Sequence, residues 1–226
     1  MSGKDNLDSA GKILAEAQQL YNDGKWLESD RVLIGWFAGL TVATDEQMAQ
    51  ANRLQGWSRY YVATKNLGDK KENLTGAENS FRAVRKYTTD KEVLISVFGG
   101  LPLVLWLLDK KGEAWIESDE GIDSFPDEPS VWNARVILCR WEKDFAASIR
   151  SCEMVFKKAF VRQDYRTAGH GKQNKADALK ELGRLAEAEN EYVAAVGLYT
   201  MFEKASGKSA EFHIKGVLDK LEKIRK

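Results

Sequence analysis

The sequence predicts an all-α protein, a solenoid of about five antiparallel helix pairs. One observation behind this prediction is a recurring pattern, in which a small residue near the start of a helix is followed four residues later by a larger one. Another is that the 226 residues include only three prolines, so that few positions interrupt a helix. Helix pairs that recur in this way bury their cores by stacking on one another. The small and large residues are Ser29 and Leu33, Ala77 and Phe81, Ser148 and Cys152, and Ala188 and Tyr192.

Helical periodicity and turn residues divide the chain into pairs. In the first pair, Ile13, Ala17 and Leu20 recur at helical spacing, and the turn signal Asn22-Asp23-Gly24 follows them. Thr44 or Asp45 is expected to cap the start of the second pair. The predicted pairs span residues 10–40, 44–88, 91–125, 129–161 and 170–206, a terminal helix over 208–225 covers the end of the stack, and the whole chain, 1–226, forms a single domain.

The third pair begins with an apolar segment, residues 93–108. A membrane-spanning helix needs about 20 apolar residues, and this segment is shorter and is interrupted by Gly99, Gly100 and Pro102. We therefore expect a buried, kinked helix or helix pair here, and no transmembrane segment. Whether the segment is core or a contact surface stays open at this point.

The helix pairs resemble the tetratricopeptide repeat, a helix-turn-helix of about 34 residues. The resemblance is clearest in the first, fourth and fifth pairs and weakest in the third. It implies a right-handed superhelix whose first helices line an inner groove that holds a partner protein or peptide. The matching positions of the fourth and fifth pairs are occupied by Trp132, Val136, Phe145, Ser148, Cys152 and Val155, and by Ala176, Leu179, Gly183, Leu185, Ala188, Tyr192 and Ala195.

The groove positions that the resemblance implies carry aromatic and polar side chains. Arg53, Trp57 and Tyr61 follow one another at intervals of four, so they share one stripe of a helix. Tyrosine, tryptophan and arginine are enriched in interface hot spots. The competing interpretation is an ordinary inter-helix core. The candidate partner-binding residues are Tyr21, Arg53, Trp57, Tyr60, Tyr61, Asn133, Arg140 and Trp141.

The residue types argue against catalysis. The two histidines belong to no metal-ligand spacing, with His170 in a glycine-flanked connection and His213 in the terminal helix. Cys139 and Cys152 occupy packing positions of one pair, where we expect them to be buried, and they form no disulfide framework. No phosphate-binding loop occurs. We therefore expect no enzyme, no metal, no cofactor and no small-molecule substrate.

Charge is balanced overall but uneven along the chain. Lys+Arg and Asp+Glu number 34 each, which gives no general attraction to nucleic acid. Residues 113–128 carry seven acidic residues and no basic one, whereas residues 156–175 carry six basic residues and one acidic one. A solvated face is the ordinary interpretation of such a run, and a docking patch is the alternative. The beginning of the chain lacks the apolar core of a signal peptide, so we expect a cytoplasmic protein.

The leading functional expectation is a non-catalytic adaptor or scaffold that binds a partner protein or peptide in the groove. The alternative is a structural subunit of a larger complex, held through its convex face and its apolar third pair. A weaker alternative is an α-helical RNA-binding protein, which would need a base-reading residue that recurs from pair to pair. The sequence leaves the oligomeric state open.

Overall fold

The computed structural model describes residues 3–39 and 42–225 of the chain. Within these ranges the regular structure is entirely helical, with no strand, which confirms the all-α prediction. The eleven helices are α1 (Gly3–Asn22), α2 (Trp26–Gly39), α3 (Asp45–Thr64), α4 (Lys70–Val84), α5 (Lys91–Leu107), α6 (Lys111–Ser124), α7 (Pro129–Trp141), α8 (Phe145–Val161), α9 (Tyr165–Glu181), α10 (Leu185–Ser206) and α11 (Glu211–Arg225).

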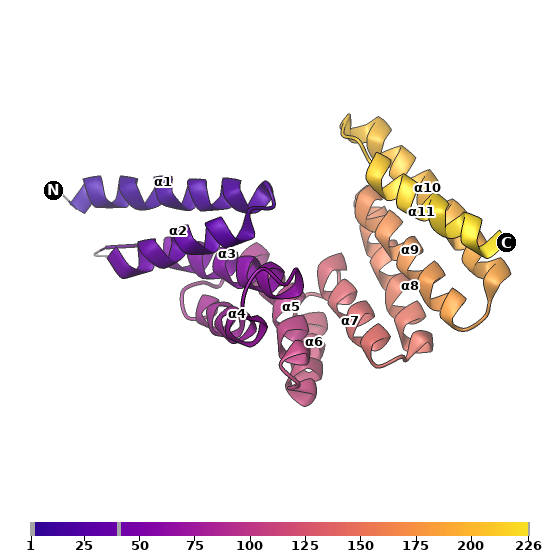
Figure 1. Ribbon diagram of the computed structural model, residues 1–226, viewed down its shortest axis with the longest axis horizontal. Helices are drawn as coiled ribbons and strands as arrows, with labels where there is room; N and C mark the ends of the chain where they lie inside the picture. The colour runs from indigo at the N-terminus through magenta and orange to yellow at the C-terminus, as the bar shows by residue number, and fades with distance from the viewer. Residues whose placement is uncertain (1–2, 40–41, 226) are drawn as a thin grey trace. The chain divides into compact units, whose positions relative to one another are not determined.

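The chain divides into two compact units, one up to Glu117 and one from Ser118, with the boundary inside α6. Consecutive helices pack from α1 to α5 in the first unit and from α7 to α11 in the second (Figure 1). In the first unit α3 also contacts α1 and α5, and in the second α7 also contacts α9. Contacts between every second helix arise when helix pairs stack side by side.

Short turns of one design join many of the helices. Lys25, Asp144, Asp164 and Arg184 each donate a backbone N–H to the carbonyl five residues earlier, at 2.9–3.0 Å. The residue before each of them has a positive φ, between 57° and 76°. This left-handed residue closes the helix end and satisfies carbonyls that the helix leaves unpaired.

A hydrogen bond at the small-residue position recurs in both units. Ser29 Oγ on α2 donates to the carbonyl of Ala17 on α1 at 2.9 Å. Ser148 Oγ on α8 donates to the carbonyl of Val136 on α7 at 3.5 Å. In both cases donor and acceptor are 12 residues apart, so the two helix pairs are joined at equivalent points.

The prediction for the start of the fifth pair is wrong. His170 lies in the middle of α9 and not in a connection, because the helix already begins at Tyr165. The Asp164 carboxylate caps it by accepting the N–H of Thr167 at 3.1 Å. Glycines 169 and 171 interrupt no helix here. A Cβ at Gly169 would lie 2.7 Å from the ring of Tyr199, so this glycine permits close packing of α10.

The apolar segment of the third pair forms one helix, α5, with Pro102 inside it. Val97, Leu101, Val104 and Leu105 are completely buried in the first unit. None of the described helices is long and apolar enough to cross a membrane. The segment therefore serves chiefly as core.

The cores of the pairs use the residues that the pattern predicts. Leu33 and Phe81 are fully buried in the first unit, and Tyr192 in the second. Cys139 on α7 and Cys152 on α8 are both buried, as predicted. Burial raises the pKa of the Cys152 thiol to about 12, so this sulfur stays protonated and unreactive at neutral pH.

Candidate functional site

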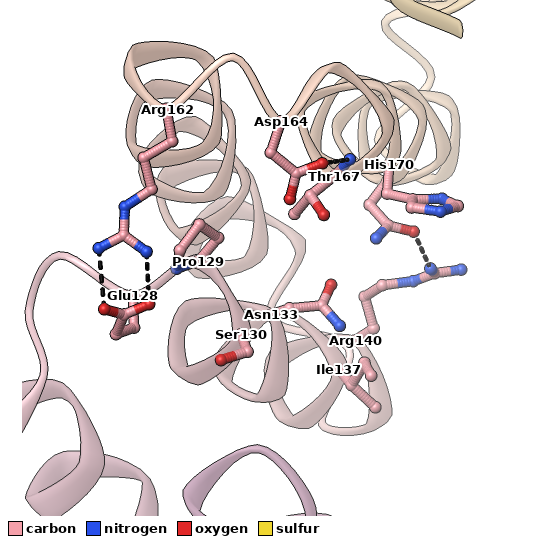
Figure 2. A pocket seen from close by; sticks show the side chains of 11 residues that line it. Glu128, Pro129, Ser130, Asn133, Ile137, Arg140, Arg162, Asp164, Thr167 and His170 are labelled. Atoms are coloured by element: carbon pink, nitrogen blue, oxygen red, sulfur yellow. Dashed lines mark hydrogen bonds and ion pairs between the residues drawn. The ribbon is translucent and has the colours of Figure 1, made fainter. Parts of the chain in front are cut away.

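The second unit carries a pocket of about 640 Å³ between α7 and α9. Each helix presents one stripe to it: residues 133, 137 and 140 of α7, and residues 167, 170 and 174 of α9. The connection between α8 and α9 closes one side, as Figure 2 shows. The lining residues are Glu128, Pro129, Ser130, Asn133, Ile137, Arg140, Arg162, Asp164, Thr167, His170 and Asn174.

The charges at the rim of the pocket are matched. The Arg162 guanidinium donates to both carboxylate oxygens of Glu128, at 2.5 and 2.8 Å (Figure 2). The hydrogen bonds that Arg162 donates to Glu128 outweigh desolvation and raise the pKa of Arg162. This pair closes one end of the pocket without a net charge.

Arg140 connects the pocket to a buried polar network. Its Nη1 donates to Asn174 Oδ1 at 3.1 Å, and its Nη2 lies 3.7 Å from Asp177 Oδ2. Asp177 also accepts the Tyr192 hydroxyl and both 2.8 Å hydrogen bonds from Lys220 on α11. The guanidinium of Arg140 is thereby fixed in position, and it shares the Asp177 carboxylate with Lys220.

Uncharged polar groups face the pocket without a partner. The side chains of Ser130, Asn133 and Thr167 line it, and none makes a hydrogen bond to the residues that the structure describes. An asparagine side chain offers both donors and an acceptor, and a hydroxyl offers one donor and two lone pairs. The pocket can therefore pair with a ligand that carries N–H and C=O groups together, which a polypeptide backbone does.

A smaller hollow of about 330 Å³ adjoins the pocket through two shared residues, Ile137 and Arg140. Trp141, Phe145 and Glu181 complete it. Trp141 is 37% exposed. The fold thus brings together three of the residues predicted from the sequence, Asn133, Arg140 and Trp141.

The other predicted residues form an aromatic cluster in the first unit. Tyr61 of α3 stacks on Trp26 of α2 with ring centroids 4.9 Å apart, and it also contacts Tyr21, Trp57 and Tyr60. All five rings are half-buried. Burial, with a further effect of Tyr61, raises the pKa of Tyr60 to about 12.

Part of this cluster serves inter-helix packing. Trp57 meets the buried ring of Phe81 on α4 edge-on at 5.5 Å, and its Nε1 donates to Ser96 on α5 at 2.8 Å. Arg53 donates to Gln50 at 3.0 Å and to Gln18 on α1 at 3.1 Å. Burial lowers the pKa of Arg53. These contacts place the stripe in inter-helix packing, and its role in partner binding stays a prediction.

Two charged segments singled out in the sequence are largely compensated between neighbouring helices. Basic partners bind at least five of the seven acidic residues in 113–128, and carboxylates bind four of the six basic residues in 156–175. The segments therefore carry much less uncompensated charge than the sequence indicates. The acidic pairs are Glu113 with Arg82, Glu117 with Arg85, Asp119 with Arg135, Asp127 with Lys158 and Glu128 with Arg162, and Lys172 and Lys175 bind Glu191.

Sequence reasoning missed the contribution of α9 to the pocket. Because the sequence placed His170 in a connection, residues 167, 170 and 174 of α9 were not predicted to share one face of a helix. The capping aspartate at 164, followed by polar residues at 167, 170 and 174, is the signal that identifies this face. Among the described residues no group of three or more histidine, cysteine or acidic side chains is arranged to hold a metal ion.

No model of a known protein family matches this chain, and a comparison with curated proteins finds no matching relative.

Proposed function

We propose that this protein is a non-catalytic adaptor that holds a segment of a partner protein in the pocket between α7 and α9. The observation that carries this proposal is the convergence of Asn133, Thr167 and Asn174, from two neighbouring helices, on one pocket. Its volume of about 640 Å³ lies in the range of pockets that bind a ligand. The bound segment is extended, and its backbone pairs with these amides and the hydroxyl.

The charge balance of the pocket supports a neutral ligand. Arg162 is paired with Glu128, and Arg140 lies between Asn174 and Asp177. A carboxylate of the ligand would compete with these partners and gain little. We therefore expect uncharged polar or small apolar side chains in the bound segment, and no requirement for an acidic tail.

The test uses a random peptide library displayed on phage, selected on the immobilised full chain. A selected peptide is then synthesised with a fluorescent label, and its affinity is measured by anisotropy. Asn133→Ala and Arg140→Ala should each weaken binding by about 1–3 kcal/mol, because they remove a polar group at the site.

The matched controls are Asn190→Ala and Arg150→Ala. Both residues are exposed and lie outside the pocket, on α10 and α8. The controls should bind as the unaltered chain does. Peptides whose binding survives both pocket substitutions, or a library from which no peptide is selected, would contradict the proposal.

We further infer that the helix pairs belong to a superhelix of the tetratricopeptide type. The equivalent serine hydrogen bonds in the first and fourth pairs support this. The spacing is a difference: α8 begins at Phe145 and α10 at Leu185, 40 residues later, against about 34 in the consensus repeat. The helices here are longer.

Calorimetry tests the expectation that the whole chain forms a single domain, since one domain unfolds in one transition.

A further inference from the structure

The only two histidines of the sequence meet in the fold. His170 lies on α9 and His213 on α11, and their ring centroids are 4.8 Å apart with the rings nearly perpendicular. The ring of Tyr199 on α10 stacks on His213 at 5.1 Å and meets His170 edge-on at 5.5 Å. Three helices therefore converge on this histidine contact, formed by His170, His213 and Tyr199.

The hydrogen bonds fix the contact. The Tyr199 hydroxyl donates to Gln173 Oε1 at 2.8 Å and lies 2.9 Å from His170 Nδ1. Because a phenol has only one hydrogen, Nδ1 is then the donor to the hydroxyl, and His170 carries its proton there. Arg166 Nη2 lies 3.4 Å from His213 Nε2, so a neutral His213 can accept at this nitrogen.

The charged groups around the contact are mainly positive. Arg166 comes from α9 itself, and Arg140 of α7 lines the same pocket as His170. From α10, Tyr199 is neutral, and Glu203 accepts the backbone N–H of Ala210 at 2.7 Å. α11 itself brings Lys215, Asp219 and Lys220 to the hollow that His213 lines. Asp164, before α9, is the acidic group that acts on His170, and its carboxylate is engaged in capping the helix. No carboxylate of the described residues hydrogen-bonds to either imidazole.

Both imidazoles are held neutral as a result. Burial lowers the pKa of His170 to about 4, and the neighbouring His213 and Arg166 act in the same direction. Burial, followed by Arg166, also lowers the pKa of His213. Protonation of both imidazoles would place two imidazolium ions beside the Arg166 guanidinium in a half-buried position.

We propose that the histidine contact is an acid-sensitive switch, which holds the beginning of α11 against α9 and α10 while both imidazoles are neutral and releases it when they are protonated. The far part of α11 has its own attachments. Lys220 binds both oxygens of Asp177 at 2.8 Å, and Val217 and Leu221 are buried in the core. The release is therefore confined to the first turns of the helix.

The switch regulates the proposed binding site, and only this consequence rests on the proposed function. His170 lines the pocket of about 640 Å³, and His213 lines a neighbouring hollow of about 460 Å³ together with Gln173, Phe212 and Gly216. Protonation of His170 adds positive charge to the wall of the pocket between α7 and α9, and release of His213 moves the wall of the neighbouring hollow. Acid therefore alters both surfaces that a bound segment would meet.

The direction of the pH effect on release follows from proton linkage. Released imidazoles bind protons near the ordinary pKa of 6.5, more strongly than the docked ones, so falling pH favours release. From a docked pKa of about 4, His170 alone should shift the equilibrium toward release roughly 20-fold between pH 7 and pH 5. His213 adds to this effect.

The first experiment measures release directly and needs no ligand. Ala210, buried next to the start of α11, is replaced in the variant Ala210→Cys, and exposed Lys208 in the control variant Lys208→Cys. Both are labelled with 4,4′-dithiodipyridine at pH 7.5 and pH 5, and the chain without an added cysteine is the blank. The ratio of the two labelling rates reports how often the start of α11 opens.

The ratio should rise at least tenfold at pH 5, and replacing both histidines by His170→Gln and His213→Gln should abolish the rise. A constant ratio in the unaltered background overturns the proposal, and so does an equal rise without the histidines.

If the start of α11 in the glutamine variant is already open at pH 7.5, a second measurement decides. Nuclear magnetic resonance must show that both histidine rings titrate below their ordinary pKa, and ordinary titration of either ring overturns the proposal. Peptide binding enters neither measurement, so failure here is distinct from failure of the proposed function.

Discussion

A Cβ at Gly56 on α3 would lie 2.7 Å from the ring of Phe81 on α4. The ring is completely buried, and a Cβ at Gly100 of α5 would lie at the same distance from its other edge. Two glycines on two helices thus make room for one aromatic residue. This explains how a phenylalanine fits at the larger position of the pattern in the second pair.

We predict that Gly56→Ala destabilises the protein by about 1–3 kcal/mol, because the added methyl group overpacks the core. The control is Gly35→Ala, in helix α2, where a Cβ meets nothing within 4 Å. This control should stabilise by up to about 1 kcal/mol through helix propensity. Urea unfolding of both variants provides the comparison, and equal effects at the two sites would refute the packing argument.

The two equivalent serines should differ in importance. Ser29 donates at 2.9 Å and also accepts a hydrogen bond from Ser58 at 3.1 Å, whereas the bond of Ser148 is 3.5 Å long. Ser29→Ala should cost about 1–2 kcal/mol, and Ser148→Ala less than about 1 kcal/mol. Thermal unfolding monitored by circular dichroism measures both. A larger loss at Ser148 would contradict the reading of these bonds.

The carboxylate of Glu78 should make stability depend on pH. Burial works to raise its pKa, but hydrogen bonds from Lys110 and Arg82 outweigh burial and hold the pKa below its ordinary 4.5. A lowered carboxyl pKa stabilises the folded state above the ordinary value, and this stabilisation is lost as pH falls through the lower one. Glu78→Gln should therefore cost more stability at pH 7 than at pH 3. A pH-independent cost, measured by urea unfolding, would count against the ion pairs.

Both thiols should be slow to react. Cys139 and Cys152 are 2% and 1% exposed, and burial raises the pKa of both. Titration with a thiol reagent at pH 7.5 should label neither within minutes in the native protein and both at once in concentrated urea. Rapid labelling of both without denaturant would show that α7 and α8 do not pack as described.

The aromatic cluster of the first unit remains a candidate for partner binding. For a partner that binds this cluster, Trp57→Ala and Tyr61→Ala should each weaken binding by about 1–4 kcal/mol, while charge reversal at Asp119 or Lys158 should chiefly change the association rate and its salt dependence. Trp57→Ala should also lower stability, because it removes the ring contact with Phe81 and the hydrogen bond to Ser96. Melting curves must accompany the binding data. Normal binding by both aromatic variants would leave the pocket between α7 and α9 as the better site.

The sequence by itself determined the helical class, most helix boundaries and the small-large pattern of the core. These features depend on neighbours three, four or five residues apart, which a linear sequence displays. The turn at Gly24 and the buried pair Ala188 and Tyr192 are examples. Two helix starts differ from the prediction. α1 begins at Gly3, seven residues before the predicted start of the first pair. α9 begins at Tyr165, because Gly169 and Gly171 indicated a break in the helix, although distant packing against Tyr199 explains the first of them.

Only the tertiary structure decided which side chains meet across the chain. His170 and His213 are 43 positions apart in the sequence, yet α9, α10 and α11 bring their rings together around Tyr199. The same holds for the compensation of the acidic segment, where Arg82 and Arg85 reach acids about 30 residues away. Such contacts depend on the register of one helix against another. That register is set by the packing of whole side chains, and no local spacing in the sequence encodes it.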